Sequence, residues 1–287
     1  MKGRSSLRQL GLATSWGNLT IAGGSRAGDG TLILLPQLQL ALDAGRPHRA
    51  LPSMNTVVVS HGHVDHLGGL AYWASQRQLQ NMADARVIAP SAIATEIDHV
   101  LSAFARLEGG DRYGVEVDGV EDGERRVIRR DMALEFFATD HWVPTLGTSL
   151  FWKRRRLRAE LSHLAGREIA ERRRRGETVT DEVETHLLAY CADSGPGVLD
   201  SEARALQAEI VLVECSFYRP TDHERARRFG HMHLDDLLGH SSAFACRHLV
   251  LLHASRRHRL REVESIIDER IRPAFECEVH HLMVDWD

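Results

Sequence analysis

Four potential metal ligands directly follow a short apolar run, and this feature limits most strongly what the chain can fold into. Residues 57–60 have the pattern of a buried strand, and His61, His63, Asp65 and His66 come next. Ligands at the end of a rigid strand are held in a turn, as a metal site requires. Imidazole and carboxylate groups suit Zn²⁺ or a similar divalent ion. Because four such ligands so close together cannot all reach one tetrahedral ion, the pattern predicts two neighbouring ions.

Three later residues occupy the same kind of position, at the point where an apolar run ends. His141 follows residues 134–140, Asp193 follows 187–192 and His253 follows 249–252. Open α/β folds gather their ligands at the carboxyl ends of strands. Each of these three residues taken singly could be a solvated loop residue. Together with the first cluster they complete two coordination spheres, so we interpret them as ligands.

Apolar runs and turn residues predict one α/β domain over residues 1–287. Short strands separated by glycine-rich turns begin the chain, and strands alternate with helices in its second half. The expected strands are Leu7–Leu12, Asn18–Ala22, Leu32–Leu35, Leu38–Asp43, Thr56–Ser60, Val127–Arg129, Ala133–Thr139, Thr148–Trp152, His186–Ala192, Ile210–Glu214, His248–His253 and Glu278–Val284. The expected helices lie at about 66–81, 91–107, 154–175, 199–208, 222–229, 233–246 and 258–269.

Composition limits the classes of partner and compartment. The net charge is −4, so any contact with nucleic acid needs a local basic patch. The first residues contain no long apolar stretch, so we expect no secretory signal. No run approaches ~18 uninterrupted apolar residues, so we expect no transmembrane helix. The cysteines form no CxxC pair and are predicted to be buried free thiols of a cytoplasmic protein; they are Cys191, Cys215, Cys246 and Cys277.

Several longer stretches are similar, in the same order along the chain, to one known family. They are Leu42–Ala50, Ser60–Leu70, Ala89–Ile93, Gly166–Ile169, Ala192–Ser194, Val213–Phe217, Gly230–Leu234 and Leu251–Ser255. With them the chain resembles the metallo-β-lactamase superfamily, and within it the short-form tRNase Z (ribonuclease Z) proteins of the plant-type branch. The resemblance covers nearly the whole chain. It implies an α/β fold of the four-layer αββα sandwich type.

The resemblance also implies a role for each ligand. It implies two divalent metal ions, for which the ligands fit zinc and also manganese. One ion would be bound by His61, His63 and His141, the other by Asp65, His66 and His253, with Asp193 bridging them. It further implies that Glu214 and His231 form an acid/base pair and that the protein is a homodimer.

The activity that the resemblance implies is that of a metal-dependent endoribonuclease, which removes the 3′ trailer of precursor tRNA. Asp65 would orient the attacking water, and His231, held by Glu214, would protonate the leaving 3′-oxygen. Two alternatives are a dinuclear-metal hydrolase of a smaller phosphodiester or ester, and a non-catalytic relative that binds RNA or metal. The presence of all the expected ligands argues against the non-catalytic relative, because a protein without activity would be free to lose them.

Residues 153–175 are strongly basic, with ten Lys and Arg against three Glu. This segment lies where the family carries its substrate-binding excursion, here at about 153–180. Phosphate contacts from it would make RNA binding depend on salt. A charged, solvated helix is the alternative interpretation. The candidate substrate residues are Lys153, Arg154, Arg155, Arg156, Ser255 and Arg256.

Two departures from the family pattern lie next to expected ligands. The family's Gly-Asp-Thr is replaced by Ala192-Asp193-Ser194, which retains a small hydroxyl residue. The usual His-Phe-Ser followed by Arg-Tyr is replaced by residues 253–258, His-Ala-Ser-Arg-Arg-His. The second change alters the wall beside one of the metals and leaves the substrate open. His48 lies in a matching stretch, but its chemistry predicts no role.

Overall fold

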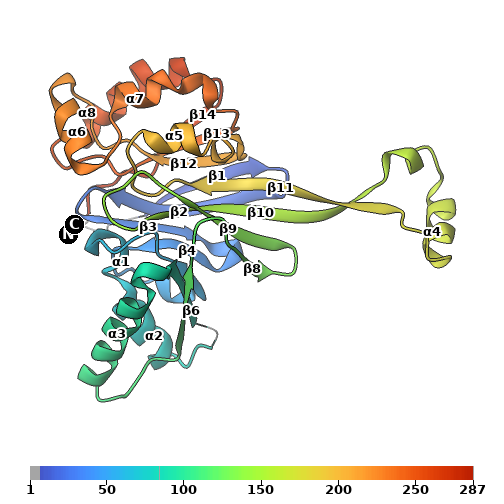
Figure 1. The fold of residues 1–287 in the computed structure, drawn as a ribbon, viewed down its shortest axis with the longest axis horizontal. Coiled ribbons are helices and arrows are strands. Elements are labelled where there is room, and N and C mark those ends of the chain that lie inside the picture. The colour runs from blue at the N-terminus through green and yellow to red at the C-terminus, as the bar shows by residue number, and fades with distance from the viewer. Residues whose placement is uncertain (1–6, 84, 287) are drawn as a thin grey trace.

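Two seven-stranded sheets pack face to face in the computed structural model, and helices cover both outer faces (Figure 1). The structure describes residues 7–83 and 85–286. Residues 1–6, part of the segment in which no secretory signal is expected, lie outside this range. Among the described residues, no helix has the length and apolar character needed to cross a membrane.

The first sheet has the strand order β1-β2-β3-β4-β5-β6-β7. Its strands are β1 (Arg8–Thr14), β2 (Gly17–Arg26), β3 (Gly30–Leu35), β4 (Leu40–Ala44), β5 (Thr56–Val58), β6 (Ala85–Pro90) and β7 (Val115–Val120). Strand pairs from β1 to β4 are antiparallel, and those from β4 to β7 are parallel. The parallel order brings the carboxyl ends of β4 and β5 to one edge of the sheet. The sequence did not predict β6 and β7; in β7, Asp118 and Gly119 have low strand propensity.

The second sheet has the order β14-β13-β12-β11-β10-β9-β8. Its strands are β8 (Arg125–Arg129), β9 (Met132–Ala138), β10 (Leu146–Leu157), β11 (Thr180–Tyr190), β12 (Ile210–Glu214), β13 (His248–Leu252) and β14 (Glu278–His281). Here too antiparallel pairs, from β8 to β11, are followed by parallel pairs, from β11 to β14. The sheets therefore repeat one plan, and every expected strand has a counterpart in them.

Three apolar cores separate the four layers. One core, which includes Leu19 and Leu188, lies between the sheets. A second, around Trp73, joins the first sheet to its helices, and a third, around Leu234 and Val263, joins the second sheet to its helices. A sheet that is buried on both faces needs a helix layer on its outer side. The expected four-layer αββα sandwich is therefore confirmed.

The helices are α1 (Val64–Leu67), α2 (Leu70–Leu79), α3 (Ser91–Leu107), α4 (Gly166–Arg174), α5 (Gly197–Ser201), α6 (His223–Phe229), α7 (Leu234–Gly239) and α8 (Leu260–Ile266). The helices expected at 91–107 and 222–229 are confirmed. The expected single helix at 66–81 is wrong, since α1 and α2 are separated at Gly68 and Gly69. A Cβ on Gly69 would lie 2.7 Å from the carbonyl oxygen of Ala44, so only glycine permits this close approach to β4. The helices expected at 199–208 and 233–246 are shorter than predicted, whereas the one expected at 258–269 is confirmed, because α8 continues as a π-helix over Ile267–Ile271.

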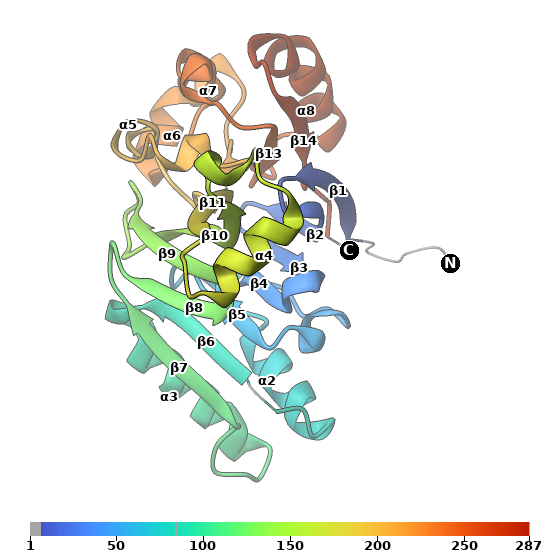
Figure 2. The same ribbon diagram turned by 90° about the vertical axis from the view of Figure 1, so that its right-hand side faces the viewer.

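The basic segment forms an arm that extends from the sandwich. Strands β10 and β11 pair from Thr148↔Tyr190 to Leu157↔Thr180, and α4 lies at the tip. Figure 2, in which the arm points at the viewer, shows α4 in front of the two sheets. The helix expected at 154–175 is therefore wrong over its first part, which is strand. Pairing with β11, distant in sequence, fixes the arginine run in an extended conformation that its own residues do not favour.

Candidate metal centre

All the expected ligands come together at one edge of the two sheets. The first sheet supplies residues 61–66, which follow β5, and the second supplies His141 after β9, Asp193 after β11 and His253 after β13. A backbone hydrogen bond of 3.0 Å from the amide of Leu146 to the carbonyl of Ser60 joins the sheets beside this site. The site thus depends on the packing of one sheet against the other.

The ligand atoms form two adjoining groups. The first group is His61, His63, His141 and Asp193, and the second is Asp65, His66 and His253, with the atoms of each group within 4.8 Å of one another. Oδ2 of Asp193 lies 3.3 Å from Nε2 of His66 and 3.2 Å from Nε2 of His253. Because Asp193 belongs to the first group and also contacts two histidines of the second, its position suits a bridging ligand.

Asp43 orients ligands of both groups through a network of hydrogen bonds. Its Oδ2 accepts from Nδ1 of His66 at 2.7 Å, from the hydroxyl of Ser60 at 2.8 Å and from the hydroxyl of Tyr190 at 2.6 Å. The oxygen of Ser60 in turn accepts from Nδ1 of His61 at 2.9 Å. Since Nδ1 of both histidines carries a proton, Nε2 keeps its lone pair for the site. Asp43 was not predicted from the sequence, although it ends an apolar strand as the predicted ligands do.

Two further histidines are fixed in the same tautomer. Nδ1 of His141 donates to the carbonyl of Gly230 at 2.9 Å. Its Nε2 is buried and has no hydrogen-bond partner among the described residues. Nδ1 of His253 donates to the hydroxyl of Ser216 at 3.1 Å, which donates to Glu214 at 2.6 Å. Buried polar atoms without partners are rare and need an explanation. An unpartnered lone pair among imidazoles and carboxylates fits a site for divalent ions of the zinc type.

Replacing Asp43 with Asn should weaken metal binding. Asn tolerates the left-handed conformation at this position, where φ is 58°, but it removes the charge and one acceptor. We expect the affinity for Zn²⁺ to fall about 10- to 100-fold, since loss of a group that orients ligands has this effect. Competition with a chromophoric chelator measures the affinity. Asp118→Asn, which breaks an ion pair with Arg126 between β7 and β8, should leave it unchanged; an equal loss in both variants would contradict the role of Asp43.

Glu214, which is buried, and His231, which is half-buried, form a pair beside the ligand groups. Nδ1 of His231 donates to Oε1 of Glu214 at 2.6 Å, and the same oxygen accepts from the amide of Ser194 at 2.9 Å. Burial lowers the pKa of His231, but the charge of Glu214 and its hydrogen bond outweigh burial and raise that pKa to about 9. The His231 ring lies 5.3 Å from the ring of His141 and 5.2 Å from that of His253. An imidazole that is held and oriented by Glu214 thus lies next to both ligand groups.

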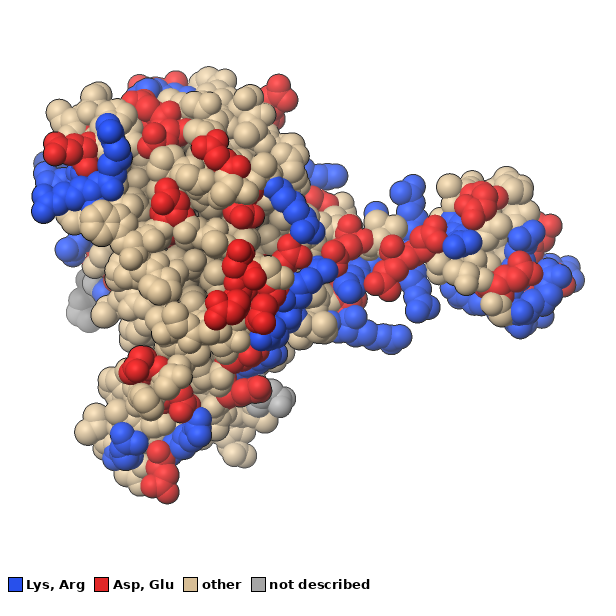
Figure 3. All heavy atoms as spheres, in the orientation of Figure 1, with Lys and Arg blue, Asp and Glu red and all other residues tan. Residues whose placement is uncertain are grey.

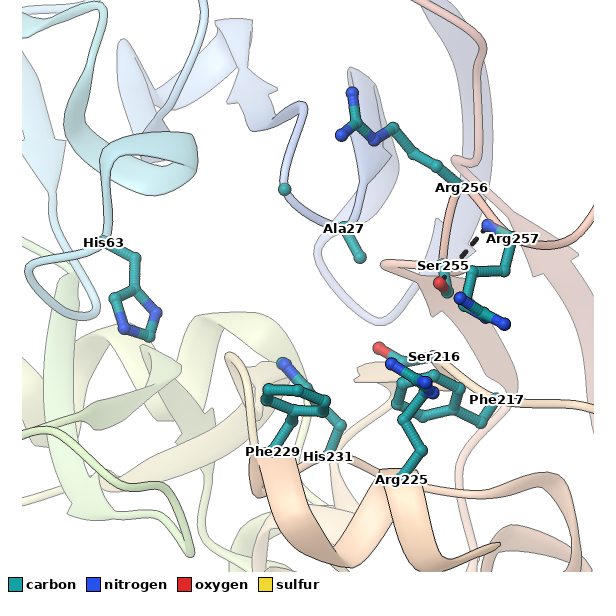
Figure 4. Close-up of a pocket in the computed structure, with 11 residues that line it drawn as sticks. Ala27, His63, Ser216, Phe217, Arg225, Phe229, His231, Ser255, Arg256 and Arg257 are labelled. Carbon is teal, nitrogen blue, oxygen red and sulfur yellow. Dashed lines mark hydrogen bonds between the residues drawn. The ribbon is translucent and has the colours of Figure 1, made fainter. Parts of the chain in front are cut away.

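A cavity of about 710 Å³ opens onto the site (Figure 4). Its lining is Ala27, Gly28, His63, Ser216, Phe217, Arg225, Phe229, His231, Ser255, Arg256 and Arg257. Figure 4 shows the predicted ligand His63 on one side, and Arg225 and Arg257 at the end away from it. Arg225 and Arg257 form no ion pair with a described residue, so they are available to an anion. The sequence did not predict Arg225 and Phe229 as site residues, because only the folded structure places their helix, α6, beside the cavity.

Part of the altered stretch, residues 253–258, lines this cavity. Ala254 and His258 are buried, and His258 packs against Tyr218. Ser255 and Arg256, two of the candidate substrate residues, line the cavity together with the neighbouring Arg257. Arg256 also lies 3.6 Å from Asp29, so its charge is partly offset. This stretch therefore places two adjacent exposed arginines, Arg256 and Arg257, at the cavity.

The other departures have structural explanations. Ala192 has a φ of 54°, a left-handed conformation that glycine adopts more easily, and this accounts for the glycine in the family. Ser194 keeps the role of a hydroxyl residue, since its Oγ accepts from the amide of Asp140 at 3.0 Å. His48 caps a turn, because its Nδ1 accepts from the amide of Ala50 at 3.1 Å.

The remaining candidate substrate residues, Lys153–Arg156, lie on β10 in the arm. Acidic residues 181, 182 and 184 of β11 face them in the register, and Lys153 pairs with Glu182 at 3.8 Å. Arg154, Arg155 and Arg156 are exposed and form no ion pair with a described residue. Figure 3 shows further Lys and Arg side chains gathered at the tip. The arm is thus less basic than residues 153–175 alone indicated, but unpaired arginines remain on its surface.

Comparisons with known proteins agree with this geometry. A model of the beta-lactamase superfamily domain matches residues 27–254. The chain is 30% identical over 251 residues to tRNase Z TRZ1 of Arabidopsis thaliana. The aligned stretch covers 86% of this chain and 89% of that protein. The chain belongs to the tRNase Z family of the metallo-β-lactamase superfamily. The resemblance described from the sequence is therefore confirmed.

Solved structures show the same fold for this tRNase Z family member. The short form of human tRNase Z is 13% identical and has a TM-score of 0.53, over 98% of this chain and 99% of that chain. The metallo-beta-lactamase fold protein YhfI of Bacillus subtilis is 16% identical and has a TM-score of 0.60, over 90% of this chain and 93% of that chain. At these identities, the likeness concerns the fold alone.

Proposed function

We propose that the protein is a metal-dependent endoribonuclease, a hydrolase that removes the 3′ trailer from precursor tRNA. The observation that carries this proposal is the Glu214–His231 pair, 2.6 Å apart, next to two groups of metal ligands. The ligands alone support hydrolysis in general. An imidazole beside them that can donate a proton supports, more specifically, cleavage of a bond whose leaving group is poor, such as a ribose 3′-oxygen. Relatives named tRNase Z, at 27–30% identity, support the same substrate.

The proposed mechanism assigns a task to each residue. Two divalent ions, zinc by preference and manganese as the alternative, would lower the pKa of a water and offset charge on the phosphate. One ion would be held by the first ligand group and one by the second. Asp193 lies close to the residues of both groups. Oδ2 of Asp65 accepts from the amide of Gly28 at 2.7 Å, which fixes the carboxylate so that it can orient the attacking water. As the water oxygen bonds to phosphorus, His231 gives its proton to the departing 3′-oxygen.

The cavity supports an elongated anionic substrate. Arginine guanidinium groups bind phosphate bidentately, and Arg225 and Arg257 have no carboxylate partner among the described residues. Phe229 is exposed and presents a ring on which a base can stack. We assign Ser255 and Arg256 to contacts with the substrate next to the cleaved bond. The second candidate function, hydrolysis of a smaller phosphodiester or ester, is supported by the same ligands and would not need this lining.

We propose that residues 153–180 bind tRNA at a distance from the cleaved bond. Strand β10 spans roughly 36 Å if each residue rises about 3.3 Å, so its outer end is far from the ligands. A substrate that reaches both must be large and rigid, as a folded tRNA is. Lys153, Arg154, Arg155 and Arg156 would contact its phosphates.

Changing Arg154, Arg155 and Arg156 to Ala should weaken binding of precursor tRNA and reduce its dependence on salt. Each lost phosphate contact lowers the slope of log K against log salt by about 0.7–0.9. Hydrolysis of bis(p-nitrophenyl) phosphate should not change, because the arm is remote from the site. Filter binding over a salt series measures the slope. If the variant loses activity on both substrates equally, the arm does not have this role.

We also propose that the chain is one hydrolase domain that works as a cytoplasmic homodimer. The cysteines are free thiols, as in a reducing compartment. An apolar groove of about 460 Å³ beside α1 and α3 exposes Val64, Val100 and Phe104, and this surface suits a second copy. Light scattering on the purified protein tests the dimer, since a monomer mass would contradict it. Cell fractionation tests the compartment, and recovery outside the cytoplasm would contradict that assignment.

Two substrates tested side by side separate the candidate functions. Zinc-loaded protein would receive a 3′-extended precursor tRNA and bis(p-nitrophenyl) phosphate, with His63→Ala as the control. We expect cleavage of the trailer, and loss of both activities in the control. Turnover of the small diester without trailer cleavage would favour the second candidate, and activity on neither would favour a non-catalytic relative.

A further inference from the structure

A separate group of ligand atoms lies at the other end of β13. His248 begins β13, and Glu278 and His280 lie on β14, where the register pairs His248 with Glu278 and Val250 with His280. Residues two apart on a strand share a face, so the three side chains project together. His253 follows the last residue of β13, roughly 17 Å along the chain from His248 at about 3.3 Å per residue. This group is therefore distinct from the ligands described above.

The three ligand atoms form a nearly equilateral triangle. Nδ1 of His248 lies 3.3 Å from Oε2 of Glu278, and Nε2 of His280 lies 3.4 Å from that nitrogen and 3.5 Å from that oxygen. Ligands about 2.0–2.1 Å from a tetrahedral ion lie about 3.3–3.4 Å from one another. The spacing thus matches three corners of a tetrahedral zinc site. The exposed carboxylate of Glu278 leaves the fourth corner open to water.

The hydrogen-bond donors and acceptors of this group favour a cation at its centre. Nε2 of His248 donates to the carbonyl of Ala13 at 3.1 Å, so in the neutral ring Nδ1 has a lone pair. That lone pair faces the oxygen of Glu278, and two acceptors at this distance repel each other. Nε2 of His280, the one remaining donor of the three atoms, can give its proton to only one of them. Either an extra proton on His248 or a metal ion would relieve the contact.

Another histidine group shows that proximity alone does not make such a site. His223, His233 and Asp235 also lie close together. However, Nδ1 of His233 accepts from the amide of Asp235 at 3.1 Å, and its Nε2 donates to the carbonyl of Arg219 at 2.9 Å. Both ring nitrogens of His233 are therefore occupied, and no lone pair is left for a metal.

We propose that His248, Glu278 and His280 bind one divalent ion of the zinc type, with water completing its coordination. Two imidazoles and one carboxylate are ligands that zinc accepts. The ion would join β13 to β14 and, through the bond from His248 to the carbonyl of Ala13, to the end of β1. Its role is structural, because the group lies away from the cavity that opens onto the metal centre.

Counting bound zinc in matched variants tests this site. Wild-type protein, His280→Ala and His223→Ala are dialysed against the same low-micromolar ZnCl₂, and zinc per chain is measured by mass spectrometry. We expect His280→Ala to hold one ion fewer than the wild type, and His223→Ala to hold the same number as the wild type. Equal zinc in His280→Ala and the wild type would overturn the proposal and leave a protonated His248 as the explanation.

A second variant keeps the test independent of folding and of activity. The Glu278 side chain is 73% exposed, so Glu278→Gln should fold normally and should also lose one ion. If Glu278→Gln retained the full zinc content, the site would be rejected even if His280→Ala were misfolded. Hydrolysis of bis(p-nitrophenyl) phosphate should be unchanged in Glu278→Gln. The proposal is decided by the difference in zinc content. It can therefore be tested even if the wild type and all the variants hydrolyse neither substrate.

Discussion

His231→Ala is expected to lower kcat/KM for precursor tRNA by about 10²- to 10⁴-fold, the usual contribution of a general acid. The ribose 3′-oxygen is a strong base and needs a proton as it leaves, whereas p-nitrophenolate does not. The loss on bis(p-nitrophenyl) phosphate should therefore be much smaller. Steady-state kinetics with both substrates on one zinc-loaded preparation measure the two losses.

The metal content decides how a loss in His231→Ala is interpreted. Nδ1 of His231 is bound to Glu214, and its ring lies beside those of His141 and His253. Glu214 stays in the variant and keeps its link through Ser216 to His253. The variant should therefore keep the zinc content of the wild type. An equal loss on both substrates, or a loss of zinc, would mean that His231 supports the metal centre and does not act as an acid.

Asp193→Ala is expected to remove activity on both substrates, by about 10³-fold or more. Its carboxylate contacts His66 and His253 at 3.3 and 3.2 Å, and His61 at 3.9 Å. Loss of a ligand shared by both groups should release zinc from each of them. A bound ion supplies several kcal/mol of transition-state stabilisation, and about 1.4 kcal/mol corresponds to tenfold in rate.

Zinc analysis and kinetics on the same Asp193→Ala preparation check this expectation. In contrast to His231→Ala, the two substrates should lose activity to the same degree. Ser194→Ala is a matched control, since it changes the adjacent residue and removes only the hydrogen bonds of its hydroxyl to the amide of Asp140 and the carbonyl of Gly195. It should keep its zinc. Full zinc content in Asp193→Ala would contradict the bridging position.

The expected ligands could be predicted because they follow apolar strands: residues 61–66 follow one strand, and His141, Asp193 and His253 each follow another. His61, Asp193 and His253 were visible in this way without any knowledge of how the strands pair. Asp43 followed the same pattern but was missed, because its partners His66 and Tyr190 come from distant parts of the chain. Local pattern thus identified the groups that would hold a metal, but not the carboxylate that orients them.

Backbone conformation and the arm were the least predictable features. Asp43, Ala192 and His253 all have positive φ at the ends of their strands, which costs roughly 1–2 kcal/mol per non-glycine residue. Such conformations persist where the surrounding structure imposes them, and they gather at functional sites. Likewise, residues 154–157 are extended only because β11 pairs with them. Neither feature has a local signal in the sequence.

The central claim is that water, held in the metal centre, attacks the phosphodiester of precursor tRNA while the 3′-oxygen leaves. Cleavage of a 3′-extended precursor tRNA in H₂¹⁸O, followed by mass spectrometry of both fragments, tests this most directly. We predict one ¹⁸O atom in the 5′-phosphate of the released trailer and a free 3′-hydroxyl on the tRNA. A 2′,3′-cyclic phosphate on the tRNA, with no ¹⁸O in the trailer, would contradict the account.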